Sequence, residues 1–175
     1  MLSINFAFWL FVFLFGLIGL MRGWAKELLV SFSVVLALAF NRLLERYVPL
    51  VNSLPADGSA IFWIRIVILA TLVFFGYQTV GLPRFAGKAA REKLQDSLLG
   101  FVLGAVNGYL IVGTVWFYLD QAKYPFEYIT APVPGTPMGD MALRLIPMLA
   151  PRLLGEPAIY FAVMLCFIFV LVVFI

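Results

Sequence analysis

The sequence predicts an all-α integral membrane protein, a polytopic bundle of about five transmembrane helices, and two observations predict this class. Of its 175 residues 64% are apolar and only 12% are charged, whereas soluble domains are typically about half apolar and a quarter charged. Five apolar stretches also have the length, roughly 17–25 residues, needed to cross a hydrocarbon core of about 30 Å. A single membrane domain, residues 1–175, accounts for the whole chain.

The predicted spans follow one another with short gaps, and their few charges lie near their ends. They are residues 4–21, 24–41, 60–82, 97–119 and 158–175. The first two are separate because one continuous helix would place Arg22 and Glu27 at the centre of the bilayer, where charge is costly. Arg65 lies five residues into the third span, and we expect its side chain to extend outward past Trp63 to the interface.

Residues 83–95 are predicted to form a basic interfacial helix on the membrane surface, opened by a proline. Its cations are Arg84, Lys88, Arg91 and Lys93. They are expected to contact anionic lipid headgroups, at about 1 kcal/mol per well-placed cation. The alternative is that they only orient the chain, as positive charges in cytoplasmic loops commonly do.

Residues 121–157 hold seven of the ten prolines and are predicted to form an external Pro-rich loop. Within it, the spacing of Met141, Leu145 and Met148 predicts a half-buried helix at the outer surface that carries these side chains on one side. The loop either docks a partner or only covers the outer ends of the helices.

The distribution of positive charge predicts the topology. Basic residues are densest in the turn after the first span and in residues 83–95, and cytoplasmic loops are enriched in Lys and Arg. We therefore expect the amino terminus outside and the carboxyl terminus inside.

The fourth span carries a glycine stripe. Gly100, Gly104 and Gly108 recur every four residues beside Asn107, and Gly16 and Gly19 narrow the end of the first span. Helices in lipid associate through close packing, which such stripes allow. The stripe is predicted to pack the first span against the fourth within one chain, with oligomerisation as the alternative.

A boundary charge cluster is predicted from Arg22, Lys26, Glu27 and Asp96. On the structural interpretation, Glu27 sits near the start of its helix and neutralises the cationic turn beside it. Glu27→Gln would then be nearly silent, because the site lies close to water. On the functional interpretation, Glu27 reaches a basic group elsewhere, such as Arg91, and clamps the turn to the basic loop.

These motifs resemble the colicin V production protein (CvpA) family. The resemblance rests on Gly-x-x-Arg-Gly-x-x-x-Glu-Leu at residues 19–28 and Asp-x-x-x-Gly-x-x-x-Gly-x-x-x-Gly at residues 96–108, and it covers about residues 4–120. It implies a small bacterial inner-membrane protein with four spans, linked to toxin production, envelope integrity and biofilm growth. The fifth span and the Pro-rich loop are then additions. The characteristic positions of the family fall on Arg22, Gly23, Glu27, Asp96, Gly100 and Gly104.

The composition argues against several classes of function. The chain has no histidine and one cysteine, Cys166, which removes Ser-His hydrolases, His-ligated haem and Cys or His metal clusters. We predict no catalytic residues, no metal and no cofactor. The central thirds of the spans lack ionisable groups, which disfavours a self-contained transporter. No site for nucleic acid is evident.

Two functions remain. The first is a non-enzymatic inner-membrane protein that acts in secretion or envelope homeostasis. The second is a structural subunit of a larger membrane complex, for example photosynthetic or respiratory, that packs against neighbouring helices, lipids, quinone or carotenoid. The expected partners are membrane lipids and other membrane subunits or a second copy of the chain.

Overall fold

The computed structural model describes residues 3–78 and 90–174, and its regular structure there is entirely helical. The long helices are α1 (Ile4–Arg22), α2 (Trp24–Tyr47), α4 (Ser59–Tyr77), α5 (Ala90–Gln121) and α8 (Ala158–Phe174). Short segments lie in the connections, namely α3 (Pro49–Asn52), α6 (Pro137–Leu145), the 3-10 turn η2 (Ile146–Met148) and α7 (Ala150–Leu153).

Four of the described helices are long and apolar enough to cross a membrane: α1, α2, α4 and the part of α5 from Lys93 to Gln121. A fifth candidate joins Pro137–Leu153 to Ala158–Val172 across a bend of 57°. The 17 residues of α8 are apolar throughout but reach only about 25 Å on their own. The predicted class, a helical membrane protein with four or five spans, is confirmed.

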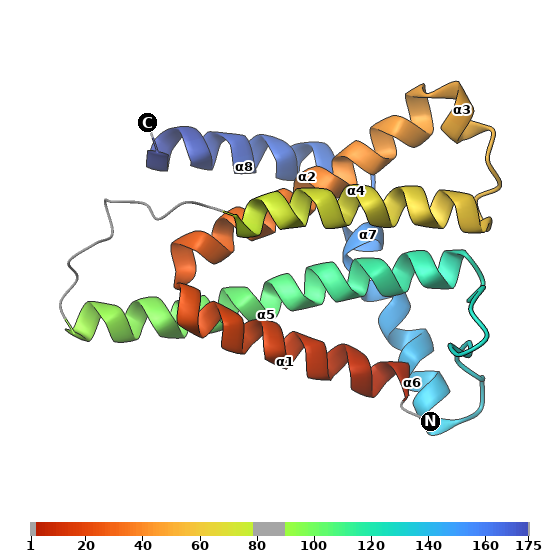
Figure 1. The fold of residues 1–175 in the computed structure, drawn as a ribbon, viewed down its shortest axis with the longest axis horizontal. Coiled ribbons are helices and arrows are strands. Elements are labelled where there is room, and N and C mark those ends of the chain that lie inside the picture. The colour runs from red at the N-terminus through yellow and green to blue at the C-terminus, as the bar shows by residue number, and fades with distance from the viewer. Residues whose placement is uncertain (1–2, 79–89, 175) are drawn as a thin grey trace.

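The long helices lie side by side and alternate in direction. In Figure 1, α1, α4 and α8 run one way along the bundle, and α2 and α5 run the other. The two chain ends therefore lie at opposite ends of the bundle, as five successive crossings would place them. Helix α5 contacts both α1 and α2, and α2 also contacts α4 and α8.

Two helices are longer than the apolar spans predicted from the sequence. Helix α2 continues to Tyr47, past residue 41, and α5 is already helical at Ala90. Residues 90–95, which were assigned to the interfacial helix, are thus continuous with the fourth span. Residues 83–89 lie outside the described part of the chain.

In the connection between α5 and α8, one of the three side chains predicted to share a side, Leu145, is half-buried against the cluster of Phe8 and Trp116. Met141 and Met148 are more than half exposed, whereas Ala142, Ile146 and Leu149 are buried against Phe8 and Trp116. Ala142 packs in one cluster with Phe8 of α1, whereas Gly139 faces the turn before α6, where an added Cβ would meet the Val133 carbonyl. At the start of α1, Asn5 Nδ2 donates a hydrogen bond to the Met138 carbonyl at 2.6 Å.

An ion pair joins the segment after α5 to the segment before α4. Lys123 donates a hydrogen bond to Asp57 and holds the pKa of that carboxyl below its usual range. A lowered folded pKa stabilises the fold above the ordinary Asp pKa of about 3.9, and this stabilisation is lost as the pH falls through the folded value.

We therefore expect Asp57→Asn to lower the thermal midpoint slightly at pH 7, and the difference to disappear as the pH falls through the lowered pKa of Asp57. The effect is small because both side chains are exposed and screened by solvent. Thermal unfolding of both proteins in detergent across this pH range checks it. A difference that persists unchanged at the lowest pH would show that the ion pair is not its source.

Candidate functional site

The backbones of α1 and α5 touch where their glycines meet. A Cβ built on Gly19 would collide with the Gly100 carbonyl and would lie 2.8 Å from the Gly104 Cα, and one built on Gly104 would lie 2.9 Å from the Gly19 Cα. Real Cβ atoms essentially never approach other atoms this closely. Only glycine fits at these positions, so the stripe forms a contact within one chain.

Two further glycines of the stripe extend this contact in different ways. Gly108 faces the Val12 backbone, with 2.9 Å between an added Cβ and the Val12 Cα. Gly16 instead faces the ring of Phe101, again at 2.9 Å. Gly108 therefore continues the backbone contact, and Gly16 makes room for an aromatic side chain.

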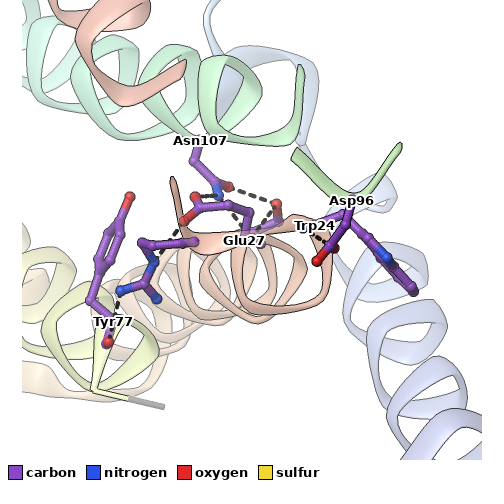
Figure 2. A network of polar contacts seen from close by, with 7 residues as sticks. Trp24, Glu27, Tyr77, Asp96 and Asn107 are labelled. Atoms are coloured by element: carbon purple, nitrogen blue, oxygen red, sulfur yellow. Dashed lines mark hydrogen bonds and ion pairs between the residues drawn. The ribbon is translucent and has the colours of Figure 1, made fainter. Parts of the chain in front are cut away.

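Gly23 forms the turn from α1 to α2, and Asp96 of α5 lies directly against it. Gly23 has φ 83°, a conformation that favours glycine, and its N–H donates to the Gly19 carbonyl. Asp96 Oδ1 accepts a hydrogen bond from the Trp24 N–H at 3.2 Å (Figure 2). A carboxylate at this position satisfies one of the free N–H groups at the start of α2 and complements the helix dipole.

Glu27 lies in the first turn of α2 and is fully buried. Arg22 Nε donates to its Oε1 at 2.8 Å, and Asn107 Nδ2 donates to its Oε2 at 2.8 Å. Figure 2 shows the Glu27 side chain beside Asn107. Each carboxylate oxygen thus has a hydrogen bond from a different helix.

Asn107 fixes α5 to α2 through three hydrogen bonds. Its Nδ2 donates both to the Glu27 side chain and to the Glu27 carbonyl at 2.8 Å, and its Oδ1 accepts from Ser31 Oγ at 2.6 Å. The residue has no exposed surface. A buried polar side chain is favourable only when its hydrogen bonds are made, as they are here.

Arg22 extends the network to the end of α4. Its Nη1 donates to the Tyr77 carbonyl at 3.2 Å, and its guanidinium lies 4.5 Å from the centroid of the Tyr77 ring. Arg22 Nη2 and the Tyr77 hydroxyl have no hydrogen-bond partner among the described residues. We call the group of Arg22, Gly23, Glu27, Tyr77, Asp96 and Asn107 the junction.

The structure brings together three members of the predicted charge cluster, Arg22, Glu27 and Asp96. Lys26 forms no ion pair within the described residues. Of the cations assigned to lipid headgroups, Lys93 is exposed on α5, Arg84 and Lys88 lie outside the described residues, and the side chain of Arg91 does too. The predicted clamp between Glu27 and Arg91 therefore cannot be placed, and both Glu27 oxygens are occupied by other partners.

Sequence reasoning assigned Asn107 to packing and did not identify its bonds to Glu27 and Ser31. One signal was present, because Ser31 lies one helical turn after Glu27 and shares its face. Tyr77 was not identified either, since its backbone carbonyl carries the interaction and no sequence pattern marks it.

A second polar group lies at the other end of α2, and there one prediction was wrong. Arg65 does not extend outward to the interface but is only 5% exposed. Its Nε donates to Glu45 at 2.7 Å and its Nη1 to Gln121 at 2.8 Å. The reason is the length of α2, which places Glu45 inside a helix beside Arg65.

Hydrogen bonds occupy both oxygens of the Glu27 carboxylate, and its two partners, Arg22 and Asn107, come from α1 and α5. In the part of the chain that the structure describes, no three His, Cys, Asp or Glu side chains gather as a metal site. The geometry of the junction suits it to fixing helices rather than to acid-base chemistry, which needs a carboxylate within reach of a substrate.

Comparison with known proteins assigns most of the chain. The family described as Colicin V production protein matches residues 4–130, which is well over half of the 175 residues. No curated protein and no solved structure matches.

Proposed function

The chain belongs to the colicin V production protein family, and from that premise we propose that it is a non-enzymatic protein of the bacterial inner membrane acting in secretion or envelope homeostasis. The observation that carries the proposal is the junction. The family positions Arg22, Gly23, Glu27, Asp96, Gly100 and Gly104 lie within the matched residues and meet at one place, where they bind α1, α2 and α5 together.

The role of the junction follows from what its groups contact. The Glu27 carboxylate is buried and hydrogen-bonded on both oxygens, so it supports a rigid helix arrangement. A protein built this way acts through its shape in the membrane, for example by supporting an export apparatus or the organisation of the envelope.

A deletion strain tests this function. Loss of the protein should reduce release of an exported toxin or increase sensitivity to detergents, and the wild-type gene should restore both. A Gly104→Ile gene should restore neither, whereas a Val106→Ile gene, altered on an exposed part of the same helix, should restore both. A deletion strain that matches the parent in both assays would contradict the proposal.

The proposed orientation places the amino terminus outside and the junction at the cytoplasmic side. This orientation rests on the density of Lys and Arg near the junction, because cytoplasmic segments are enriched in these residues. In cells, a membrane-impermeant thiol reagent should label a cysteine at Thr136 but not one at Lys93, after Cys166 is replaced. Labelling at Lys93 and protection at Thr136 would reverse the orientation.

A structural role in a larger membrane complex is the second candidate, and α8 is the feature that favours it. It lies beyond residue 130, contacts α2, and leaves Phe161, Leu165 and Phe167 more than 60% exposed. Another subunit, a second copy or lipid would cover this surface. Purification in mild detergent separates the candidates, because a stoichiometric set of partners supports the complex and a lone chain supports the first proposal.

A further inference from the structure

A cavity of about 560 Å³ lies at the end of α2 remote from the junction. Its walls come from α2, α4 and α5, and from residues 151–156 around α7. The charged residues that line it are Arg42, Glu45, Arg46, Arg65, Arg152 and Glu156. Cavities of about 300–1,000 Å³ are the usual size of small-molecule sites in proteins.

Only two of the four arginines that line this cavity are paired with carboxylates in the described structure. Arg65 pairs with Glu45 at 2.7 Å, and Arg46 pairs with Glu156 at 3.2 Å. A hydrogen bond from Tyr160 and the nearby charges of Arg46 and, more weakly, Arg42 hold the pKa of Glu156 below its usual range, so this carboxylate remains ionised at neutral pH.

The other two arginines, Arg42 and Arg152, leave the cavity with an excess of positive charge. Arg42 Nη2 donates to the Pro151 carbonyl at 2.7 Å, a neutral acceptor. The side chain of Arg152 makes no hydrogen bond or ion pair with the described residues. Four arginines and two carboxylates line the cavity, and such an excess of positive charge favours a bound anion.

We propose that this cavity binds a phosphate-bearing anion, held by Arg42 and Arg152. Guanidinium groups present parallel N–H donors that match the oxygens of phosphate. Phe117 and Pro151 add apolar wall, which suits the hydrocarbon part of a phospholipid next to its phosphate. The phosphate comes either from an anionic lipid or from a soluble phosphate, and both present the same oxygens.

Part of the cavity comes from outside the residues matched by the family. Pro151, Arg152, Gly155 and Glu156 line it and follow residue 130. The carboxyl-terminal segment therefore contributes one of the two lining arginines that form no ion pair with the described residues, and the site includes residues beyond the matched part.

The test uses the full-length protein purified in phosphate-free detergent. Calorimetry measures its affinity for inorganic phosphate, and native mass spectrometry measures retention of phosphatidylglycerol relative to phosphatidylcholine. The main variant is Arg152→Gln, since this side chain makes no described contact that the fold needs. Arg144→Gln is the matched control, because Arg144 is an exposed arginine of α6 that does not line the cavity.

Arg152→Gln should weaken binding of at least one probe about tenfold, the effect of losing a charge-assisted hydrogen bond, while Arg144→Gln changes it less than twofold. Loss confined to inorganic phosphate identifies a soluble ligand, and loss confined to phosphatidylglycerol identifies a lipid. Absence of binding to both probes, or equal binding by the two variants, would overturn the proposal. Arg42→Gln, measured at matched thermal stability, should repeat the result.

Discussion

Replacing Gly104 with isoleucine should lower the free energy of unfolding. Overpacking a dense interior typically costs about 1–3 kcal/mol, and we expect a value near the upper end of this range. The new side chain would meet the backbone of α1 at Phe15 and Gly19, and a backbone cannot rotate away as a side chain can. The two helices must then separate, and they lose close contacts along the whole stripe. Unfolding in mixed detergent micelles, followed by circular dichroism, measures the change.

The control for this variant is Val106→Ile, two residues further along the same helix. Val106 is 43% exposed, so the added carbon should meet lipid or detergent and change stability by less than about 0.5 kcal/mol. If Gly104→Ile were as stable as Val106→Ile, the contact between α1 and α5 would be absent from the folded protein.

Replacing Glu27 with alanine should have the largest effect of any single change at the junction. Removing one partner of a buried ion pair typically costs about 3–5 kcal/mol, because the other charge remains buried without an acceptor. The lower end applies here, since the Arg22 side chain is 23% exposed. Asn107 would lose an acceptor as well.

Glu27→Gln should also destabilise the protein, by about 1–3 kcal/mol. One terminal atom of the amide is a donor, and it would face a donor from either Arg22 or Asn107. The prediction from sequence that this change is nearly silent assumed a site close to water, whereas Glu27 has no exposed surface. Glu127→Ala, at an exposed residue after α5, is the control and should be silent. Equal stability of the Glu27 and Glu127 variants would show that the junction does not stabilise the folded protein.

The general plan of the fold could be predicted from the sequence because hydropathy and glycine spacing are local signals. The helix ends could not, and α2 shows why. Arg42, Glu45 and Arg46 end its apolar run, yet the helix continues because partners from α4 and the α7 region neutralise or bind these side chains. A hydropathy score treats every charged side chain as unpaired, and it therefore misses charges that have partners on another helix.

The site was predictable only in part for a related reason. The glycines and the charged residues of the turn are close in sequence or regularly spaced, so their grouping is visible. Asn107 lies 80 residues after Glu27, and its hydrogen bonds depend on the rotation of α5 against α2. Pairings of this kind are set by tertiary packing; the sequence shows that Glu27 and Ser31 share a helix face but not which residue of α5 meets them.

The central claim is that Glu27 and Asn107 act as one unit that joins α2 to α5, and a double-mutant cycle tests it directly. Unfolding free energies of Glu27→Gln, Asn107→Ala and the double variant should show a coupling of about 1 kcal/mol or more. The control cycle uses Asn41→Ala in place of Asn107→Ala. Asn41 is a buried asparagine about 21 Å from Glu27 along α2, so the effects of Glu27→Gln and Asn41→Ala on the unfolding free energy should be additive. Additive energies for Glu27 and Asn107 would contradict the claim.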